Sequence, residues 1–459
     1  MNILPNSFEA RDVAYHFHGY TNARTHEAKG PMVIETGKGI RVFDNTGKSY
    51  IEAMAGLWSV AVGFDEQRLV DAAAQQMAKL PFYHNFSHKS HGPAIDLAER
   101  LIGIAPVPMS KVFYTNSGSE ANDTILKMLW YRSNAMGQPQ KKKIISRLGG
   151  YHGVTIAAAS MTGLPNNHRS FDLPIEGVLH TTCPYYWRDG RDGESEEDFA
   201  TRCAEDLDAM IKAEGPDTIA AFIAEPIMGA GGVVVPPATY WTKIQAVLAK
   251  YDIILVADEV ICGFGRTGKM FGSETLGITP DVITMSKQIT SSYFPFAAIM
   301  VNDRFYQPIA DESERIGVLG HGFTAGGHPV GAAVALENLN IIEERGLVEQ
   351  AAEVGGHLLR RLNEMTAHPL VAEARGRGLL AAIEIVPPKE SDTIFAPGEL
   401  GGRLNALMSE NGVISRNMVD ALAFCPPLII TQAEVDEMLG IVTKSLDQLA
   451  SELGSKGTA

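Results

Sequence analysis

The sequence is poor in cysteine and has no long apolar run, and both absences narrow the class of protein. Only four of its 459 residues are cysteine, and none of them stands in a C-x-x-C pair. Scattered cysteines argue against a disulfide framework or a zinc knuckle and fit a reducing compartment. No apolar stretch approaches the roughly 18 residues that a membrane-spanning helix needs. We therefore expect no membrane span.

Positive charge is also scarce. Lys and Arg number 39 against 54 Asp and Glu, which gives a formal charge of −15 at pH 7. Nucleic acid and anionic membranes are therefore not expected as partners. Residues 1–7 lack a basic stretch followed by an apolar one, so no signal peptide is expected either. The expected location is the cytoplasm.

Short apolar segments alternate with helical stretches through the middle of the chain. The length favours two or more subdomains, and 45% hydrophobic residues suffice for a large core. The predicted strands are apolar almost throughout, as is typical of strands buried on both faces; they span residues 111–115, 143–146, 218–224, 253–257, 282–285 and 297–301. This alternation predicts an α/β fold with a mainly parallel, doubly wound sheet.

The pattern changes near residue 330, which predicts a second, smaller α+β domain. Pro329 opens a long helical run that Gly346 ends, a strand follows at 378–385, and Thr431 and Glu434 form a capping box before the last helix. A hairpin-like stretch at 39–51 is expected to join this domain. The predicted units are an N-terminal segment at 1–60, a large domain at 61–330 and a small domain at 331–459.

One pair of residues points to chemistry. Asp258 closes one predicted strand and Lys287 follows another. By itself, a lysine after a strand is most often a solvated loop charge. At neighbouring strand ends, however, a carboxylate and an amine reach the same crevice of an α/β sheet. Pyridoxal phosphate needs both, since its aldehyde bonds to a lysine and its ring nitrogen pairs with a carboxylate.

Other segments suit the same cofactor. Gly118 and Ser119 stand at a predicted helix start, where backbone N–H groups favour binding of a phosphate. An ordinary helix start without a ligand has the same sequence pattern. Tyr151, between glycines, is suited to stacking on a ring. Glu225 ends a strand before a glycine-rich loop, and Thr324 is a hydroxyl in the loop at 320–329.

Together these segments resemble the class III pyridoxal-phosphate aminotransferases, and within them the pyruvate-using ω-transaminases. The motifs that carry the resemblance occur in order along nearly the whole chain: Gly56-Leu-Trp, Asn116-Ser-Gly-Ser-Glu-Ala, Tyr151-His-Gly, Glu225-Pro, Asp258-Glu-Val, Gly263-Phe-Gly-Arg-Thr-Gly, Ser286-Lys, Thr324 and Pro426-Pro-Leu. The resemblance implies a fold-type I enzyme whose large domain has a seven-stranded sheet. It also implies a ping-pong reaction through pyridoxamine phosphate, between an amine donor and a keto acid.

The resemblance implies a role for each residue. Lys287 bonds to the cofactor and moves a proton, and Asp258 pairs with the ring nitrogen. Val260 and Tyr151 cover the ring faces, Gly118 and Ser119 bind the phosphate, and Glu225 lies near Asp258. Thr324 reaches the phosphate from a neighbouring subunit, so a homodimer is implied; whether dimers pair into tetramers is left open.

A substrate pocket is implied as well. Its apolar wall comprises Phe17, Trp58 and Phe86, with Ala230 leaving room opposite. Arg416 matches an arginine that turns inward to bind a carboxylate. Val419 stands where relatives more often have a glycine, and we expect it to stiffen the loop after Arg416.

Rival interpretations remain at this level. Residues 263–268 form a G-x-G-x-x-G, but a poor helix follows, which disfavours an NAD-dependent dehydrogenase. His84, His88 and His91 lack accompanying carboxylates or cysteines, so no metal site is expected there or elsewhere. A binding protein without catalysis would not need both Lys287 and Asp258. Within class III, use of 2-oxoglutarate in place of pyruvate, and aminomutase or decarboxylase chemistry, stay open, as does the amine donor.

Overall fold

The centre of the molecule is a seven-stranded sheet with the strand order β4-β10-β9-β8-β7-β5-β6. The computed structural model describes residues 5–388 and 393–456. The strands are β4 (Lys111–Thr115), β5 (Lys143–Arg147), β6 (Val178–Thr181), β7 (Ile219–Ala224), β8 (Ile254–Asp258), β9 (Val282–Met285) and β10 (Ala297–Val301). Only β10 runs antiparallel to its neighbours, β4 and β9. The predicted mainly parallel sheet is therefore confirmed, with β6 as an unpredicted edge strand.

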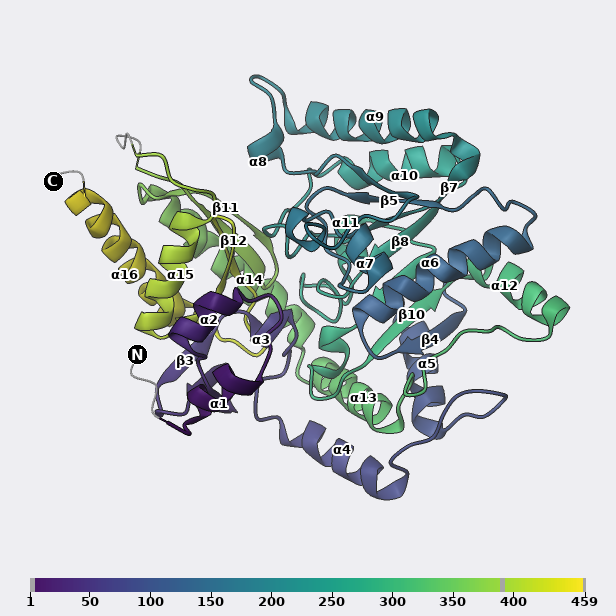
Figure 1. Cartoon of the computed structure of the whole chain (residues 1–459), viewed down its shortest axis with the longest axis horizontal. Coiled ribbons are helices and arrows are strands. Elements are labelled where there is room, and N and C mark those ends of the chain that lie inside the picture. Colours follow the sequence, from purple (N-terminus) through teal and green to yellow (C-terminus); the bar gives the residue numbers. More distant parts are fainter. Residues whose placement is uncertain (1–4, 389–392, 457–459) are drawn as a thin grey trace.

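Helices cover both faces of this sheet, as Figure 1 shows. Successive residues of β8 point to opposite faces. Val256 packs in the apolar cluster that contains residues of α6 (Gly118–Ala135) and α12 (Asp303–Ile316). Leu255 packs with α9 (Glu196–Glu214) and α10 (Tyr240–Lys250). Burial on both faces explains why β7, β8, β9 and β10 are apolar almost throughout.

Two smaller sheets lie on the other side of the molecule. One has the order β11-β12-β15-β14 and the other β1-β2-β3-β13. Their strands are β1 (Ile34–Lys38), β2 (Arg41–Asp44), β3 (Ser49–Glu52), β11 (Val371–Arg377), β12 (Leu380–Ile385), β13 (Val413–Ile414), β14 (Arg416–Met418) and β15 (Ala421–Phe424). The N-terminal hairpin thus shares a sheet with a C-terminal strand, because β3 pairs in parallel with β13. The boundaries at 60 and 330 stay predictions.

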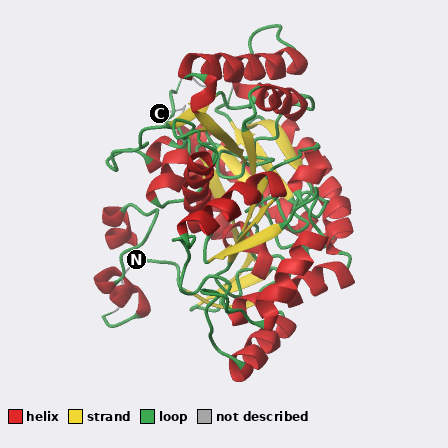
Figure 2. Ribbon diagram, turned by 90° about the vertical axis from the view of Figure 1, so that its right-hand side faces the viewer, coloured by secondary structure: helices red, strands yellow, loops and turns green. Residues whose placement is uncertain are grey.

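The remaining helices connect and cover these sheets. They are α1 (Phe8–Tyr15), α2 (Ala23–Lys29), α3 (Ala55–Trp58), α4 (Gln67–Lys79), α5 (Gly92–Gly103), α7 (Ile156–Met161), α8 (Tyr186–Asp189), α11 (Gly272–Leu276), α13 (Pro329–Glu344), α14 (Leu347–Glu364), α15 (Glu399–Asn411) and α16 (Gln432–Lys456). Four short 3₁₀ helices are η1 (Pro165–Asn167), η2 (Pro216–Thr218), η3 (Lys287–Thr290) and η4 (Met365–Ala367). In the side view of Figure 2, helices surround the strands.

Local sequence signals set several helix ends. Pro329 is the first residue of α13, and Gly346 separates α13 from α14 with a left-handed φ of 60°. At α16, Thr431 Oγ1 accepts a hydrogen bond from the Glu434 backbone N–H at 3.2 Å, and Glu434 Oε2 accepts one from the Thr431 N–H at 2.8 Å. The predicted capping box is therefore present. Among helices at residues 5–388 and 393–456, none combines the length and apolar character that crossing a membrane requires.

Candidate active site

Lys287 stands directly after the buried strand β9, at the first position of η3. Its φ is 47°, in the left-handed region that side chains other than glycine rarely adopt. Ser291 and Ser292, at 48° and 59°, share this conformation. Such strain persists only where the surroundings hold it.

Several buried side chains hold η3 in place. Asn338 Nδ2 donates to the Gln288 carbonyl at 2.8 Å, and Ser291 Oγ donates to Asn338 Oδ1 at 2.7 Å. Gln288 Nε2 donates to the carbonyls of Ile261 and Gly263 at 3.0 and 2.9 Å. The backbone of Lys287 is therefore fixed from both α13 and the loop after β8.

Burial lowers the pKa of the Lys287 amine, whereas Asp258 and Glu225 act in the opposite direction. A buried lysine with a lowered pKa loses its proton more readily than a solvated one. The amine is therefore suited to attack an aldehyde and to carry a proton afterwards.

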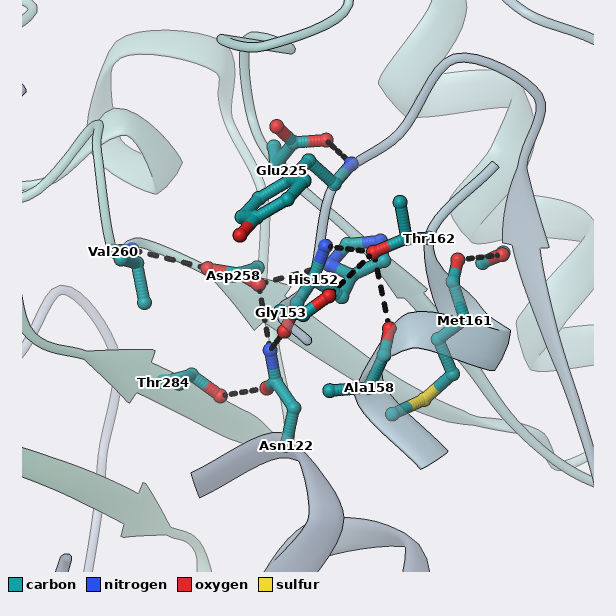
Figure 3. A network of polar contacts seen from close by, with 12 residues as sticks. Asn122, His152, Gly153, Ala158, Met161, Thr162, Glu225, Asp258, Val260 and Thr284 are labelled. Carbon is teal, nitrogen blue, oxygen red and sulfur yellow. Dashed lines mark hydrogen bonds and ion pairs between the residues drawn. The ribbon is translucent and has the colours of Figure 1, made fainter. Parts of the chain in front are cut away.

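Asp258 ends β8 at the same edge of the sheet, and three donors fix its carboxylate (Figure 3). Asn122 Nδ2 donates to Oδ2 at 2.9 Å, and His152 Nδ1 lies 2.8 Å from the same oxygen. The Val260 backbone N–H donates to Oδ1 at 3.2 Å. The Asp258 carboxylate is therefore held in one orientation at the wall of a cavity that Lys287 also lines.

The donors to Asp258 are themselves positioned. Asn122 Nδ2 also donates to the His152 carbonyl at 2.7 Å, and Thr284 Oγ1 donates to Asn122 Oδ1 at 2.9 Å. Figure 3 shows Asn122, His152 and Thr284 arranged around the carboxylate. The network links α6, the loop after β5 and strand β9.

A cavity of about 140 Å³ joins these groups to the N-terminus of α6. Its lining includes Gly118, Ser119, Asp258, Val260 and Lys287. A Cβ added at Gly118 would lie 3.1 Å from Val260 Cγ2, so the helix start needs glycine to pass this close to the cavity wall. The first N–H groups of a helix lack intrahelical partners and attract anions.

Glu225 positions the opposite wall of the cavity. Its Oε2 accepts from the Tyr151 backbone N–H at 3.2 Å and its Oε1 from the Gly229 N–H at 3.1 Å. Burial raises the pKa of Glu225. The carboxylate therefore joins the Tyr151 loop to the glycine-rich loop that carries Ala230, and Figure 3 draws its bond to the loop backbone.

Trp58 and Arg416 lie next to this cavity. Trp58 is buried in an apolar cluster with Ile261, which lines the cavity. Arg416, the first residue of β14, is close enough to influence the pKa values of both Tyr151 and Lys287. The site thus combines an apolar wall with one guanidinium.

A buried glutamate, Glu52, holds the turn that carries Trp58 through hydrogen bonds to its backbone. Glu52 is buried, and its carboxylate accepts hydrogen bonds from the Met54 and Gly56 backbone N–H groups. Burial raises the pKa of Glu52 to about 7. Ala55 and Trp58 themselves have positive φ values of 49° and 65°, so this carboxylate holds a strained turn.

Comparisons with known proteins agree with this geometry. Residues 22–446 match the family model of the class-III aminotransferases. The chain belongs to the class III aminotransferases. It is 47% identical over 418 residues to gamma aminobutyrate transaminase 1, mitochondrial, of Solanum lycopersicum, covering 91% of this chain and 81% of that one.

Two solved structures add to this result. An omega transaminase from Pseudomonas jessenii in complex with PMP shares 58% identity and a TM-score of 0.96, over 98% of this chain and 99% of the other. A transaminase with L-Ala shares 63% identity and a TM-score of 0.91, over 92% of this chain and all of the other. The fold-type I architecture and the transaminase activity are thereby confirmed.

The cofactor of this aminotransferase is pyridoxal phosphate, and the cavity fits it. A partly buried amine, a hydrogen-bonded carboxylate and a helix N-terminus face one space. When bound, the cofactor supplies an aldehyde that bonds to amines and a ring that withdraws electrons. Lys287, Asp258 and Gly118 are the residues that would meet its aldehyde, its ring nitrogen and its phosphate.

Six predicted residues of the aminotransferase chain do not line this cavity: Phe17, Trp58, Phe86, Ala230, Thr324 and Arg416. Phe17 is 89% exposed and borders a separate cavity beside His16 and His18. A Cβ at Gly322 would lie 2.5 Å from the Phe86 ring, so Phe86 packs on the loop that carries Thr324. Phe86 and the loop that carries Thr324 border a different cavity of about 750 Å³, which is lined by Phe86 and Phe323.

Sequence reasoning missed several residues of the site. His152 lies inside the Tyr151-His-Gly motif and Asn122 directly follows the motif that begins at Asn116, but spacing alone does not show which side chain turns toward Asp258. Burial raises the pKa of the Tyr151 phenol, and a hydrogen bond with Tyr20, in an exposed N-terminal loop, adds to this effect. Tyr20 therefore contacts the cofactor region within its own chain, whereas the role of Phe17 stays a prediction.

The rival motifs have structural explanations. His91 caps α5, since its Nδ1 accepts from the Ala94 N–H at 3.3 Å, and its Nε2 lies 2.9 Å from the Gly327 carbonyl oxygen. The glycines at 265 and 268 form turns, and Arg266 between them donates to the Leu379 carbonyl at 3.0 Å. The G-x-G-x-x-G therefore holds the chain segment at Leu379 and starts no nucleotide-binding helix.

Proposed function

We propose that this enzyme moves an amino group from a primary amine or ω-amino acid to pyruvate, giving alanine by a ping-pong reaction. The observation that carries the proposal is the pairing of one guanidinium, Arg416, with the apolar wall around Trp58. A pocket for an amine without an α-carboxylate needs the apolar wall, whereas a small keto acid needs a cation.

Lys287 and Asp258 have different roles in the proposed reaction. With the cofactor bound, the amine of Lys287 would hold its aldehyde, and once free it would be the group that carries a proton at the reacting carbon. The carboxylate of Asp258, oriented by Asn122 and His152, would pair with the protonated ring nitrogen. Tyr151 and Val260 would cover the two faces of the ring.

The relatives support this substrate class. The solved transaminase that is 63% identical is described with L-Ala, the amino acid that pyruvate yields. The tomato relative is named for γ-aminobutyrate, which is itself an ω-amino acid. Use of 2-oxoglutarate is the second candidate, because a guanidinium also binds a dicarboxylate.

We further propose that the active unit is a homodimer in which a second copy supplies Phe86 and Thr324. These residues share one loop region and lie outside the Lys287 cavity of their own chain. A phosphate at the α6 N-terminus would gain a hydroxyl from Thr324, and the amine pocket would gain an apolar wall from Phe86.

A half-reaction titration tests the substrate assignment. The enzyme is first converted with excess amine to its aminated cofactor form, freed of amine, and then titrated with pyruvate or 2-oxoglutarate while the cofactor absorbance is followed. Pyruvate should restore the aldehyde form at least about ten-fold faster, since pyruvate leaves no second carboxylate unpaired in the apolar pocket. Faster return with 2-oxoglutarate would reject the pyruvate assignment.

A further inference from the structure

The N-terminal segment carries three histidines around one aspartate, outside the cofactor cavity. Asp12 lies in α1, His16 and His18 follow that helix, and His26 lies in α2. We name these four side chains the Asp12 cluster. Figure 2 shows the helices next to the N-terminus at the margin of the molecule.

The nitrogen atoms of the Asp12 cluster converge on the carboxylate. His16 Nδ1 lies 3.0 Å from Asp12 Oδ1, whereas His18 Nε2 and His26 Nε2 lie 2.7 and 2.9 Å from Oδ2. The His18 ring centroid is 4.2 Å from those of both His16 and His26. The donor atoms of Asp12, His16 and His18 all lie within 4.8 Å of one another.

Charge in the cluster favours a cation. Within the described part of the chain, the ion-pair partners of Asp12 are all histidines, so neither lysine nor arginine neutralises it.

The arrangement is also costly without a ligand. Holding three imidazoles against one surface carboxylate removes side-chain freedom for contacts that water could make equally well. By comparison, His357 and His368 lie in the ordinary setting, with Asp436 and Asp447 as their respective carboxylate partners. Convergence of four donors is what distinguishes the Asp12 cluster.

We propose that the Asp12 cluster binds one divalent transition-metal ion, with Zn²⁺ as the preferred ion. Three imidazole nitrogens and one carboxylate oxygen complete a four-coordinate site of the structural kind, with Zn–N distances of about 2.0–2.1 Å. A tetrahedral ion separates its ligand atoms by roughly 3.3 Å. The contacts of 2.7–3.0 Å to Asp12 therefore need to lengthen by roughly 0.3–0.6 Å, and His26, which lies outside the group of donor atoms within 4.8 Å, needs to turn toward the other three residues. This proposal revises the expectation that the chain has no metal site.

Metal binding would join the N-terminal helices to the cofactor region. The ion ties the end of α1, the following loop and α2 into one unit. That loop carries Tyr20, whose hydroxyl accepts a hydrogen bond from Asn167 Nδ2 at 2.6 Å and which lies next to Tyr151. The site is therefore placed to fix the segment that contacts Tyr151.

Equilibrium dialysis of the full-length holoenzyme, freed of any affinity tag, against Zn²⁺ tests this proposal. We expect one bound ion per chain. Replacing a ligand, as in His18→Ala or the nearly isosteric Asp12→Asn, should weaken affinity at least about ten-fold. His368→Ala is the matched control, since it removes a histidine with a carboxylate neighbour elsewhere and should leave affinity unchanged.

Cobalt gives an independent spectroscopic measurement. Co²⁺ added to the holoenzyme should show the visible absorption of a tetrahedral nitrogen–oxygen site, and Asp12→Asn should remove it while the cofactor spectrum persists. Fewer than one saturable ion per chain would overturn the proposal. Equal affinity in His18→Ala, Asp12→Asn and His368→Ala would overturn it as well, because the bound ion would then lie elsewhere.

Discussion

The strained backbone of Lys287, the partial burial of its side chain and the carboxylates near it all affect its Nζ atom. We expect Lys287→Ala to lose the yellow colour of the covalently bound cofactor and at least about a thousand-fold in activity, because both nucleophile and proton carrier are gone. Absorbance and borohydride reduction followed by peptide mass analysis measure this. The exposed Lys269, changed to Ala, is the control. A reducible cofactor bond retained at the same site would contradict the role.

Arg416 should matter for the keto acid and little for an uncharged amine. A charge-assisted pair contributes about 1.5–3 kcal/mol, so Arg416→Ala should lower kcat/KM for pyruvate by roughly ten- to a hundred-fold. The value for an arylalkylamine should change less than about three-fold. Arg416→Lys keeps the charge without the planar fork and should fall between. Equal losses for both substrates would count against this role.

At this scale, the sequence identified residues whose type is chemically constrained and missed those that act through orientation. The cofactor's aldehyde requires a lysine and its ring nitrogen requires a carboxylate. Lys287 and Asp258 were therefore identified from their residue types and from their positions at strand ends. Asn122 and His152 hold Asp258 through particular rotamers. Nothing in one-dimensional spacing determines which of the polar side chains after a strand turns inward. Phe17 and Tyr20 are aromatic neighbours in one loop, and only the folded loop distinguishes them.

At the scale of elements, the turn after β14 stores strain at Val419. Its φ is 56°, a region that β-branched residues avoid, and its side chain is 60% exposed. We expect Val419→Gly to raise the free energy of unfolding by about 1 kcal/mol, since the strain disappears and little burial is lost. Urea unfolding measures this. Val419→Ala keeps a Cβ and should gain less; a Gly variant less stable than the parent chain would show that the turn is unstrained.

The Trp58 turn should depend on pH through Glu52. Burial raises the pKa of Glu52 from 4.5 to about 7, so between these values the folded chain holds a proton that the unfolded chain has lost. The contribution of Glu52 to the free energy of unfolding therefore falls as pH rises through this window, by up to about 1.4 kcal/mol per pH unit. Above pH 7 the loss is constant.

Glu52→Gln removes this titration. The difference in unfolding free energy between the two proteins should change across this window and level off above it, measured by urea unfolding at several pH values. Glu410→Gln, which changes a glutamate on the surface, is the control. A constant difference at every pH would mean that Glu52 is ionised throughout.

Strands and helices were predictable where one physical signal dominates. The buried central strands were predictable because both faces meet helices, and the start of α16 because Thr431 and Glu434 form a capping box. Strand β6 was missed, since His180 and Thr181 interrupt a short edge segment that is only partly buried. The pairing of β3 with β13 joins segments far apart in sequence, and no local pattern encodes it.

At the scale of the whole molecule, sharing of sites between subunits predicts complementation. Thr324→Glu would place a carboxylate against the phosphate and Lys287→Ala removes the nucleophile, so each variant alone should be inactive. In a mixed dimer one site receives both changes and the other receives neither. Co-expression with separate tags should therefore yield mixed dimers with about half the parent activity per dimer.

A matched pair of changes in one chain controls for this result. A dimer of unchanged chains and chains carrying both Lys287→Ala and Thr324→Glu should have one defect in each site, and so little activity. If the first mixed dimer is inactive and this second one keeps about half the activity, Thr324 serves its own chain, and the proposed second-copy role is wrong. The purified mixed dimers are compared by steady-state rate and by cofactor content.

The pairing of β3 with β13 also constrains how the protein is made. Ribosomes add roughly 5–20 residues per second, so β13 is synthesised about 20 to 70 seconds after its partner strand β3. During this time the N-terminal hairpin has an unpaired edge that invites association with other nascent chains. Arg416 follows in the same late segment, so the substrate pocket is completed only near the end of translation. Chaperone protection of the first fifty or so residues should therefore matter more for yield than the stability of the finished enzyme.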